Sequence, residues 1–282
     1  MTGTAMRYIP IKNATMPQRA LAACLILGIA LSFPAATAPA PAVAHLTAEQ
    51  IVAKNVKARG GLDAWRKIDT MVSIGQLQTG NPSMPSVPFV LQQARPNKTH
   101  FEVHVREKTS VRVFNGVEGW KLHQSHSGNP EVLAYTADEI AAARDGPGID
   151  GPLIDYRSKG VGVDFDGIDE VAGKKTYRLK VKLPSGATRR WWIDAATFLD
   201  VKYERESRTS TGQSATVTVS FANYKSVDGL LIPHSIITGQ ESGKGQEAML
   251  VEQVFFNRPM GDKVFSQPHA PMHMQSASPH AG

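Results

Sequence analysis

Residues 221–236 read FANYKSVDGLLIPHSI, the pattern of a strand, a tight turn and a second strand. The turn is predicted at residues 226–229, because Asp-Gly favours chain reversal. The second strand, residues 230–234, shows an apolar run, whereas a half-buried antiparallel strand alternates apolar and polar residues. Pro233 lacks the N–H that a sheet ladder uses, so an edge position or a bulge is expected there.

A strand that is apolar on both sides marks a junction between a sheet and its cover. We predict that Leu230 and Ile232 face the interior of the protein. Leu231 then points outward, where exposed apolar surface at a sheet margin needs protection. That protection is expected from an N-terminal helix, through Val52 and Val56, or from a partner protein.

Most of the chain after residue 70 reads as strands separated by short turns. In residues 177–183, Tyr, Leu, Val and Leu alternate with Arg, Lys and Lys, which gives the strand one dry and one wet face. The predicted strands are 70–78, 87–94, 98–106, 109–115, 117–124, 161–171, 174–184, 188–194, 198–206, 214–225, 229–238 and 247–257.

Helices are few. Thr47 and Gln50 form a capping box at the start of one helix, which Gly60-Gly61 ends. Residues 62–68 predict a short helical turn, and a second capping box begins a helix over residues 136–144.

The numbers of strands and helices predict the architecture. About 10 strands at ~4.8 Å spacing make a sheet roughly 48 Å wide, and a helix covers only about 10 Å of it. A flat sheet would expose its dry face, so the sheet must curl. The predicted fold is mainly β: a strongly curved antiparallel sheet, an incomplete barrel of about 10–12 strands, with a few short helices plugging an apolar cavity.

The first 44 residues have the layout of a secretory signal peptide. They hold three basic and no acidic residues, an apolar run from Ala20 to Phe33, and a small-residue stretch that predicts cleavage before His45. Met1 or Met16 can serve as the initiator. We expect a soluble periplasmic protein with a main domain at 45–266 and a disordered tail at 267–282.

Cys24 follows a lipobox-like Leu-Ala-Ala, but the apolar run continues through it, so we interpret it as part of the signal. The mature chain then has no cysteine and no disulfide. Removal of the signal leaves 28 Lys and Arg against 25 Asp and Glu, a net charge of +3, which gives no reason to expect nucleic-acid binding.

Catalytic and metal-binding motifs are absent from the sequence. It contains no nucleophile elbow, phosphate loop or zinc spacing, so no enzyme activity, cofactor or metal site is predicted. Asp164-Phe165-Asp166-Gly167 hints at calcium, but the spacing of an EF-hand loop is missing. The His and Met residues of the tail are possible copper ligands, although an inert tail is the more common outcome.

Four segments resemble a known family. They are RGGLDA at 59–64, GPLIDY at 151–156, WIDAATFL at 192–199 and residues 223–236. These segments are similar to those of outer-membrane lipoprotein-sorting proteins, relatives of the LolA-like periplasmic carriers, and the resemblance spans residues 46–268. It implies a curved sheet closed by helices over a cavity for acyl chains. The shared segments are turns and strands, and no binding residue is carried over from the family.

The predicted function is therefore that of a periplasmic binder or carrier of acyl chains, including those of lipoproteins in outer-membrane biogenesis. Its predicted partners are acyl chains, lipoproteins and, transiently, inner- or outer-membrane proteins. The alternatives are a periplasmic stress sensor on the same fold and an uncharacterised enzyme. The side chains predicted to bind lipid are Leu179, Val181, Trp191, Ile193, Val217, Val219, Phe221, Leu230 and Ile232.

Overall fold

The computed structural model describes residues 46–81, 84–106, 108–125, 129–208, 214–240 and 246–269, all within the unit His45–Gly282. The predicted signal peptide, Cys24, the cleavage position before His45 and most of the tail lie outside the described residues.

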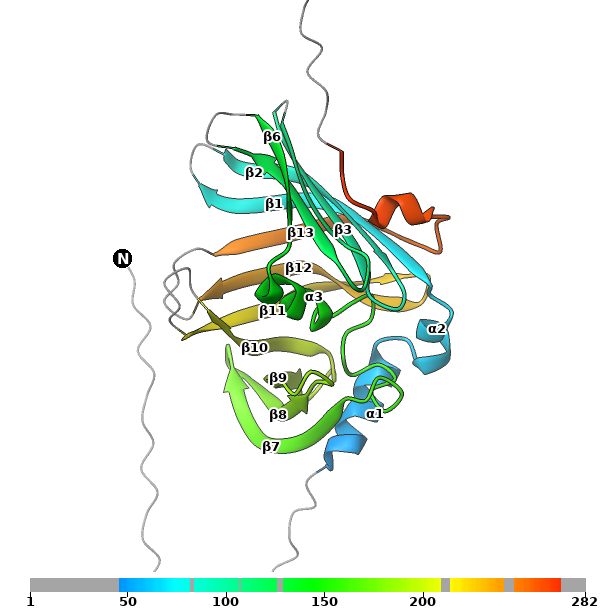
Figure 1. Ribbon diagram of the computed structural model, residues 1–282. Coiled ribbons are helices and arrows are strands. Elements are labelled where there is room, and N and C mark those ends of the chain that lie inside the picture. Colours follow the sequence, from blue (N-terminus) through cyan, green and yellow to red (C-terminus); the bar gives the residue numbers. More distant parts are fainter. Residues whose placement is uncertain are drawn as a thin grey trace, which may run out of the picture. The chain divides into compact units, whose positions relative to one another are not determined.

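Thirteen strands form one antiparallel sheet (Figure 1). Its order is β6-β5-β4-β3-β2-β1-β13-β12-β11-β10-β9-β8-β7, so two meanders meet where β1 pairs with β13. The strands are β1 Thr70–Asn81, β2 Met84–Ala94, β3 Lys98–Val105, β4 Lys108–Phe114, β5 Gly119–Gln124, β6 Pro130–Ala134, β7 Gly162–Val171, β8 Lys174–Lys182, β9 Thr188–Asp194, β10 Asp200–Arg208, β11 Ser214–Val227, β12 Leu230–Gln240 and β13 Glu247–Phe256. β6 and β7 are free edges, so the barrel is incomplete, as predicted.

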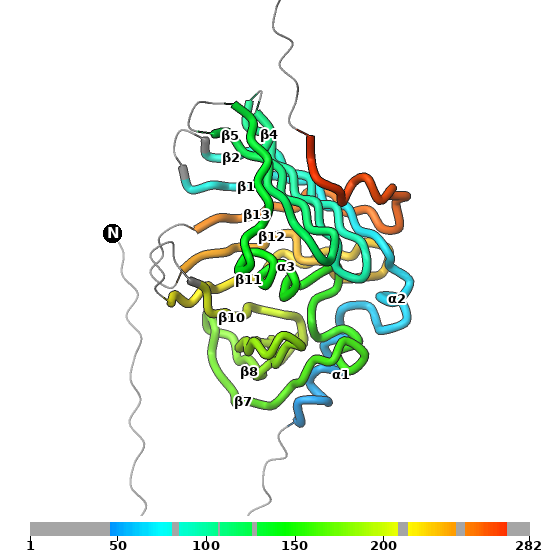
Figure 2. The backbone as a smooth tube through the Cα atoms, viewed as in Figure 1, coloured from blue at the N-terminus to red at the C-terminus, as the bar shows by residue number. Residues whose placement is uncertain are grey.

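The sheet is bent about its middle strands, which gives it a concave and a convex face (Figures 1 and 2). A register shift at Ile74/Gly75 contributes, because a β-bulge increases local twist. A Cβ at Gly75 would lie 2.0 Å from the carbonyl oxygen of Leu250, so only glycine lets the two strands approach this closely.

The described residues also form three α-helices and one 3-10 helix: α1 Ala48–Ala58, α2 Leu62–Arg66, α3 Ala137–Arg144 and η1 Asp262–Phe265. Both predicted capping boxes are present. In α1, the Thr47 hydroxyl accepts from the Gln50 N–H at 3.3 Å, and the Gln50 side chain accepts from the Thr47 N–H at 2.9 Å. α1 and α2 lie at one end of the sheet, and α3 lies in front of its middle strands (Figure 1).

Two clusters of buried apolar side chains line the concave face. The first joins α1 to β8–β11 through residues such as Ile51, Leu179 and Trp191. The second joins α2 to β1, β2, β12 and β13 through Trp65, Phe89 and Leu230, among others. The turn segment 147–160 links the two clusters, because Leu153 belongs to the first and Ile154 to the second.

Among the described residues, the convex face carries one cluster of buried apolar side chains, near the C-terminus. There Phe265 of η1 packs with Val111, Val113 and Leu122, and the His100 ring nitrogen Nδ1 lies 2.7 Å from the carbonyl oxygen of Val264. This small third cluster ties the end of the described chain to β3, β4 and β5.

The structure bears on two predictions about this stretch. β12 as a whole is an interior strand, but its Pro233 part has one partner strand, as an edge position requires: it pairs with β11, while the ladder to β13 covers Ser235–Thr238. The predicted position of the N-terminal helix is wrong. The N-terminal helix covers the Leu230 side and not the Leu231 side, since Val52 lies in the first core cluster and Val56 contacts both clusters.

The twelve predicted strands are all present, and the structure adds β6. This strand has only five residues and begins with proline, so it carries little periodic signal.

Candidate functional site

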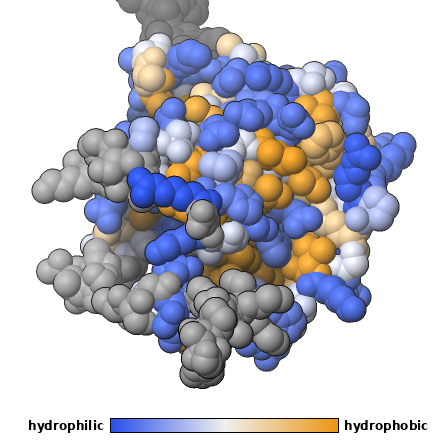
Figure 3. All heavy atoms as spheres, turned by 90° about the horizontal axis from the view of Figure 1, so that it is seen from above, coloured by the Kyte–Doolittle hydropathy of each residue, from blue (hydrophilic) through white to orange (hydrophobic). Residues whose placement is uncertain are grey.

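A set of half-buried apolar side chains lies on the concave face between the two core clusters. We call this set the concave wall: Leu77, Phe101, Val103, Val217, Phe221, Ile236 and Met249. The ladder places Ile236 opposite both Phe221 and Met249, so the wall is continuous across β11, β12 and β13. The space-filling view shows apolar patches reaching the surface between polar ones (Figure 3).

Aromatic rings support one end of the wall. Trp191 stacks on Tyr203 with ring centroids 4.6 Å apart, and Phe221 lies 5.9 Å from Tyr203. A hydrogen bond holds the Trp191 ring in this position: its indole N–H donates to an Asp200 carboxylate oxygen at 2.7 Å. Aromatic side chains at these spacings form a rigid apolar surface.

Helix α1 is locked onto the sheet by a buried polar network around Asp200. The Asn55 side-chain amide donates to Asp200 at 3.3 Å and to the Phe198 carbonyl at 2.8 Å, and Arg59 lies 3.4 Å from Asp200. The Tyr224 hydroxyl donates to the Asp200 carbonyl at 3.0 Å, and burial raises its pKa far above the usual range. Separating α1 from the sheet would leave buried charges without partners, which costs several kcal/mol.

A second buried carboxylate, Asp150, fixes the turn segment 147–160. It accepts from Arg95 at 2.7 Å and from Lys159, and its carbonyl accepts from Arg59 at 2.9 Å. Burial lowers the pKa of Lys159, and the neighbouring Asp150 carboxylate opposes that change. The two carboxylates together link α1, the turn segment and the sheet.

Helix α3 is held differently. None of its residues is buried. Polar contacts hold its N-terminal end, where the Glu139 carboxylate accepts from Lys121 at 2.8 Å and lies 3.8 Å from Arg112. Because Lys121 and Arg112 project from β5 and β4, α3 rests on the sheet through one partly buried and one exposed ion pair, and such pairs stabilise weakly when solvent reaches them.

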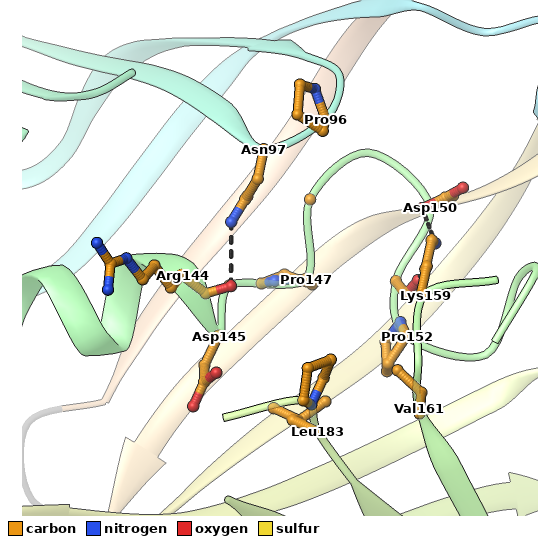
Figure 4. Close-up of a pocket in the computed structure, with 14 residues that line it drawn as sticks. Pro96, Asn97, Arg144, Asp145, Pro147, Asp150, Pro152, Lys159, Val161 and Leu183 are labelled. Carbon is orange, nitrogen blue, oxygen red and sulfur yellow. Dashed lines mark hydrogen bonds and ion pairs between the residues drawn. The ribbon is translucent and has the colours of Figure 1, made fainter. Parts of the chain in front are cut away.

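The C-terminal end of α3 leads into a glycine-rich bend beside a cavity of about 270 Å³ (Figure 4). Figure 4 shows the Asn97 side chain pointing at the carbonyl oxygen of Arg144, a hydrogen bond of 3.0 Å. The bend continues through Gly146-Pro147-Gly148, where a Cβ at Gly148 would meet nothing within 4 Å and the Gln93 side chain donates to the Gly148 carbonyl oxygen at 2.8 Å. Glycines without side-chain contacts give this bend the backbone freedom that a hinge requires.

A separate apolar pocket of about 430 Å³ lies between α1, the start of α2 and the turn segment. Val52, Val56 and Leu62 line it from the helices, and Leu153 and Tyr156 line it from the turn segment. It abuts the first core cluster, since Leu153 belongs to both.

The nine side chains predicted to bind lipid all lie in or against the two concave-face clusters, and their role in binding stays a prediction. Val217 and Phe221 are half-buried members of the concave wall. The other seven are buried beneath it: Leu179, Val181, Trp191, Ile193, Val219, Leu230 and Ile232.

Two arginines on this face, Arg189 and Arg205, were not predicted as site residues. The alternation of residues 188–194 could have identified Arg189 as a site residue, because Arg189 lies on the same side of the strand as Trp191. Within the described ranges, no three His, Cys, Asp or Glu side chains come together as a metal site, and no helix is long and apolar enough to cross a membrane.

The architecture is similar to those of solved structures. A LolA superfamily protein from Nitrosomonas europaea is 14% identical with a TM-score of 0.52, and the match covers 79% of this chain and 99% of that chain. The protein has the LolA-like fold. An outer membrane lipoprotein-sorting protein domain from Vibrio parahaemolyticus is 12% identical with a TM-score of 0.50, over 76% of this chain and 94% of the other.

A DUF1329 family protein from Desulfovibrio piger is similar to this chain at 9% identity, with a TM-score of 0.50 and coverage of 78% of this chain and 97% of that chain. No family model and no curated protein matches the sequence. At these identities the comparisons confirm the predicted resemblance at the level of fold, and the function must be argued from the site.

Proposed function

We propose that the protein binds the acyl chains of lipids or lipoproteins on its concave wall and carries them, with no covalent step. The observation that carries this proposal is the contrast at the wall: its apolar side chains are half-buried, and the helix in front of the sheet has no buried residue. Acyl chains would replace α3 as the cover of the wall.

The energies favour such an exchange. Each buried methylene group contributes about 0.8 kcal/mol, so an acyl chain of ordinary length supplies roughly 10 kcal/mol when most of it is buried. The ion pairs of Glu139 and the hydrogen bonds of Asn97 hold α3 with about 1 kcal/mol each, and the hydrogen bond from the buried Arg189 to the Asp145 carbonyl adds about 1.5–3 kcal/mol. Displacing α3 therefore requires less free energy than binding of the acyl chain releases, whereas α1 stays in place.

The place of action in this proposal is the periplasm, because the first 44 residues have the layout of a signal peptide. Purified protein from the periplasmic fraction is expected to begin at His45, and Cys24→Ala is expected to leave this unchanged. Recovery of an acylated, membrane-bound form beginning at Cys24 would instead indicate a membrane-anchored protein that accepts lipids or lipoproteins.

A neighbouring pair of isoleucines on β12 provides the test of binding. Ile236 lies on the concave wall and Ile237 on the convex face, and both are half-buried. The probe is a diacylated peptide titrated into the protein while Trp emission is recorded. Ile236→Glu is expected to weaken binding at least about 10-fold, because a charge placed under an acyl chain is costly, while Ile237→Glu binds as the wild type does.

Thermal unfolding of both variants controls for folding. Equal losses of binding in the two variants, or a wild type that binds no acylated probe, would remove the basis of the proposal.

Organic extraction and mass spectrometry of the purified protein identify any natural cargo. A sensor would use the same wall, and a transfer assay to acceptor membranes separates the two: a carrier passes its cargo on, whereas a sensor retains it.

A further inference from the structure

Two arginines lie side by side at one end of the concave wall. Glu204 of β10 pairs with Arg190 of β9, so continuing this ladder by one residue brings Arg205 opposite Arg189. Alternate residues of a strand point to the same side. Arg205 therefore shares the face of Tyr203, and the Arg189 guanidinium lies 5.2 Å from the Tyr203 ring centroid. The aromatic end of the wall is thus bordered by two guanidinium groups.

Arg189 is buried with part of its hydrogen-bonding capacity unused. The residue is 6% exposed, and its Nη2 donates to the carbonyl oxygen of Asp145 at the C-terminal end of α3. Its Nη1 is buried and has no partner in the part of the chain that the structure describes. A buried charged donor without an acceptor destabilises a protein, so its presence calls for a ligand or another explanation.

The surroundings compensate the positive charge of the pair only in part. Burial lowers the pKa of Arg189; Tyr203 and the Asp145 carboxylate oppose this change, and the charge of Arg205 adds to it. The Asp145 carboxylate accepts a hydrogen bond from the Ser185 hydroxyl at 2.9 Å, whereas Arg189 donates to the Asp145 carbonyl. Among the described residues Arg205 forms no ion pair. Like charges opposite each other on neighbouring strands are unfavourable.

The convex face of the same strand shows the opposite arrangement. There Arg190 lies 2.6 Å from the Glu204 carboxylate, which also accepts from Lys202 at 2.7 Å. We propose that Arg189 and Arg205 bind the anionic head group, a phosphate or a carboxylate, of a lipid whose acyl chains lie on the concave wall. This inference rests on the proposed function and narrows its cargo to acidic lipids.

The geometry couples head-group binding to the movement of α3. A guanidinium presents parallel N–H groups that match two oxygens of a phosphate or carboxylate. The unpartnered Nη1 of Arg189 supplies one donor. Release of the Asp145 carbonyl, as α3 lifts, supplies Nη2 as a second. The head group would thus take over a contact that holds the C-terminal end of α3 in the form without cargo.

The test compares two lipids with identical acyl chains, phosphatidylglycerol and phosphatidylcholine, titrated into the full protein with Trp emission as the readout. The wild type is expected to bind phosphatidylglycerol at least about 10-fold more tightly, the difference that charge-assisted hydrogen bonds provide. Arg189→Gln and Arg205→Gln should lose this preference and bind phosphatidylcholine as before. Arg190→Gln, on the convex face, is the matched control and should keep the preference.

The outcomes separate this inference from the proposed function. Equal affinity of the wild type for both lipids overturns the head-group site and leaves acyl binding standing, whereas binding of neither lipid removes both. Inorganic phosphate alone is a third probe; if it displaces phosphatidylglycerol at comparable concentration, the arginines form a site for free anions and the lipid assignment is wrong. If Arg189→Gln fails to fold by thermal unfolding, the half-exposed Arg205 decides the question through Arg205→Gln.

Discussion

At the scale of single residues, Gly60 determines how the N-terminal helices meet the sheet. Its φ of +111° lies in a region that side chains disfavour. A Cβ there would lie 2.7 Å from the carbonyl oxygen of Gly229, at the turn between β11 and β12. This contact lets the neighbouring Arg59 carbonyl accept from the Trp65 indole at 3.0 Å and from the Leu231 N–H at 3.3 Å.

Substituting Gly60 and the adjacent Gly61 separates two effects on stability, the close contact with the Gly229 carbonyl and backbone strain. Gly61 also has a positive φ, +91°, but a Cβ there would meet nothing within 4 Å. Gly61→Ala should cost about 1–3 kcal/mol, the strain of that backbone region alone. Gly60→Ala should cost more, because the Gly229 carbonyl must also move. Urea unfolding measures both, and a Gly60 variant no less stable than its Gly61 counterpart would contradict the role of the contact.

At the scale of elements, α1 and α3 differ in what fixes them. Ala48, Ile51, Val52 and Asn55 of α1 are buried, and α3 has no buried residue. Burial raises the pKa of Glu139, but the hydrogen bonds from Lys121 and the Thr136 N–H outweigh it and hold the pKa below its usual range. The Glu139 carboxylate is therefore charged at neutral pH, and its contacts with β4 and β5 are intact.

Hydrogen exchange should report this difference directly. Segments with few buried contacts open with small free energies, so the amides of α3 are expected to exchange much faster than those of α1. Mass spectrometry of peptic peptides covering residues 137–144 and 48–58 measures both helices in one experiment. Glu139→Gln should raise the exchange of α3 and leave α1 unchanged. Protection of α3 equal to that of α1 would exclude it as a movable cover.

Sequence patterns predicted the elements unevenly, for physical reasons. The alternating strands and both capped helices were predictable, because their signals are local. The turn segment 147–160 was not, since Ile149, Leu153 and Ile154 are buried by contacts with distant parts of the chain and follow no period. The position of α1 was wrongly predicted because residues 230–234 are apolar on both sides and do not show which side a helix covers.

At the scale of the whole molecule, the curved sheet and its apolar concave face were predictable by counting strands against helices. How far core side chains fill the space inside the curved sheet could not be predicted from the sequence. Seven of the nine predicted binding side chains are buried in the core, and only Val217 and Phe221 are half-exposed on the wall. The arginine pair escaped prediction because its meaning depends on the β9–β10 register and on the position of α3, which no local pattern specifies.

Stability of the whole molecule should fall in acid because several carboxyl groups have lowered pKa values in the folded state. The hydrogen bond from Arg66 lowers the pKa of Asp155, and the Trp192 indole lowers that of Asp169. Burial raises the pKa of Asp194, but the N–H groups of Thr197 and Ala196 outweigh it and hold it low. Each group contributes stability above its unfolded pKa of about 4, and the contribution is lost as the pH falls through the folded value.

Urea unfolding at pH 7, 5 and 3 checks this dependence. The transition midpoint should change little between pH 7 and 5 through these carboxyl groups and drop clearly by pH 3. Asp194→Asn is the matched variant, because its side-chain oxygen can still accept from the N–H groups of Ala196 and Thr197 at 2.9 and 2.8 Å but does not titrate. Its midpoint should fall less than that of the wild type between pH 5 and 3. Identical falls in the two proteins would show that Asp194 does not contribute to the acid sensitivity, since a group with a lowered folded pKa must release its share of stability in that window.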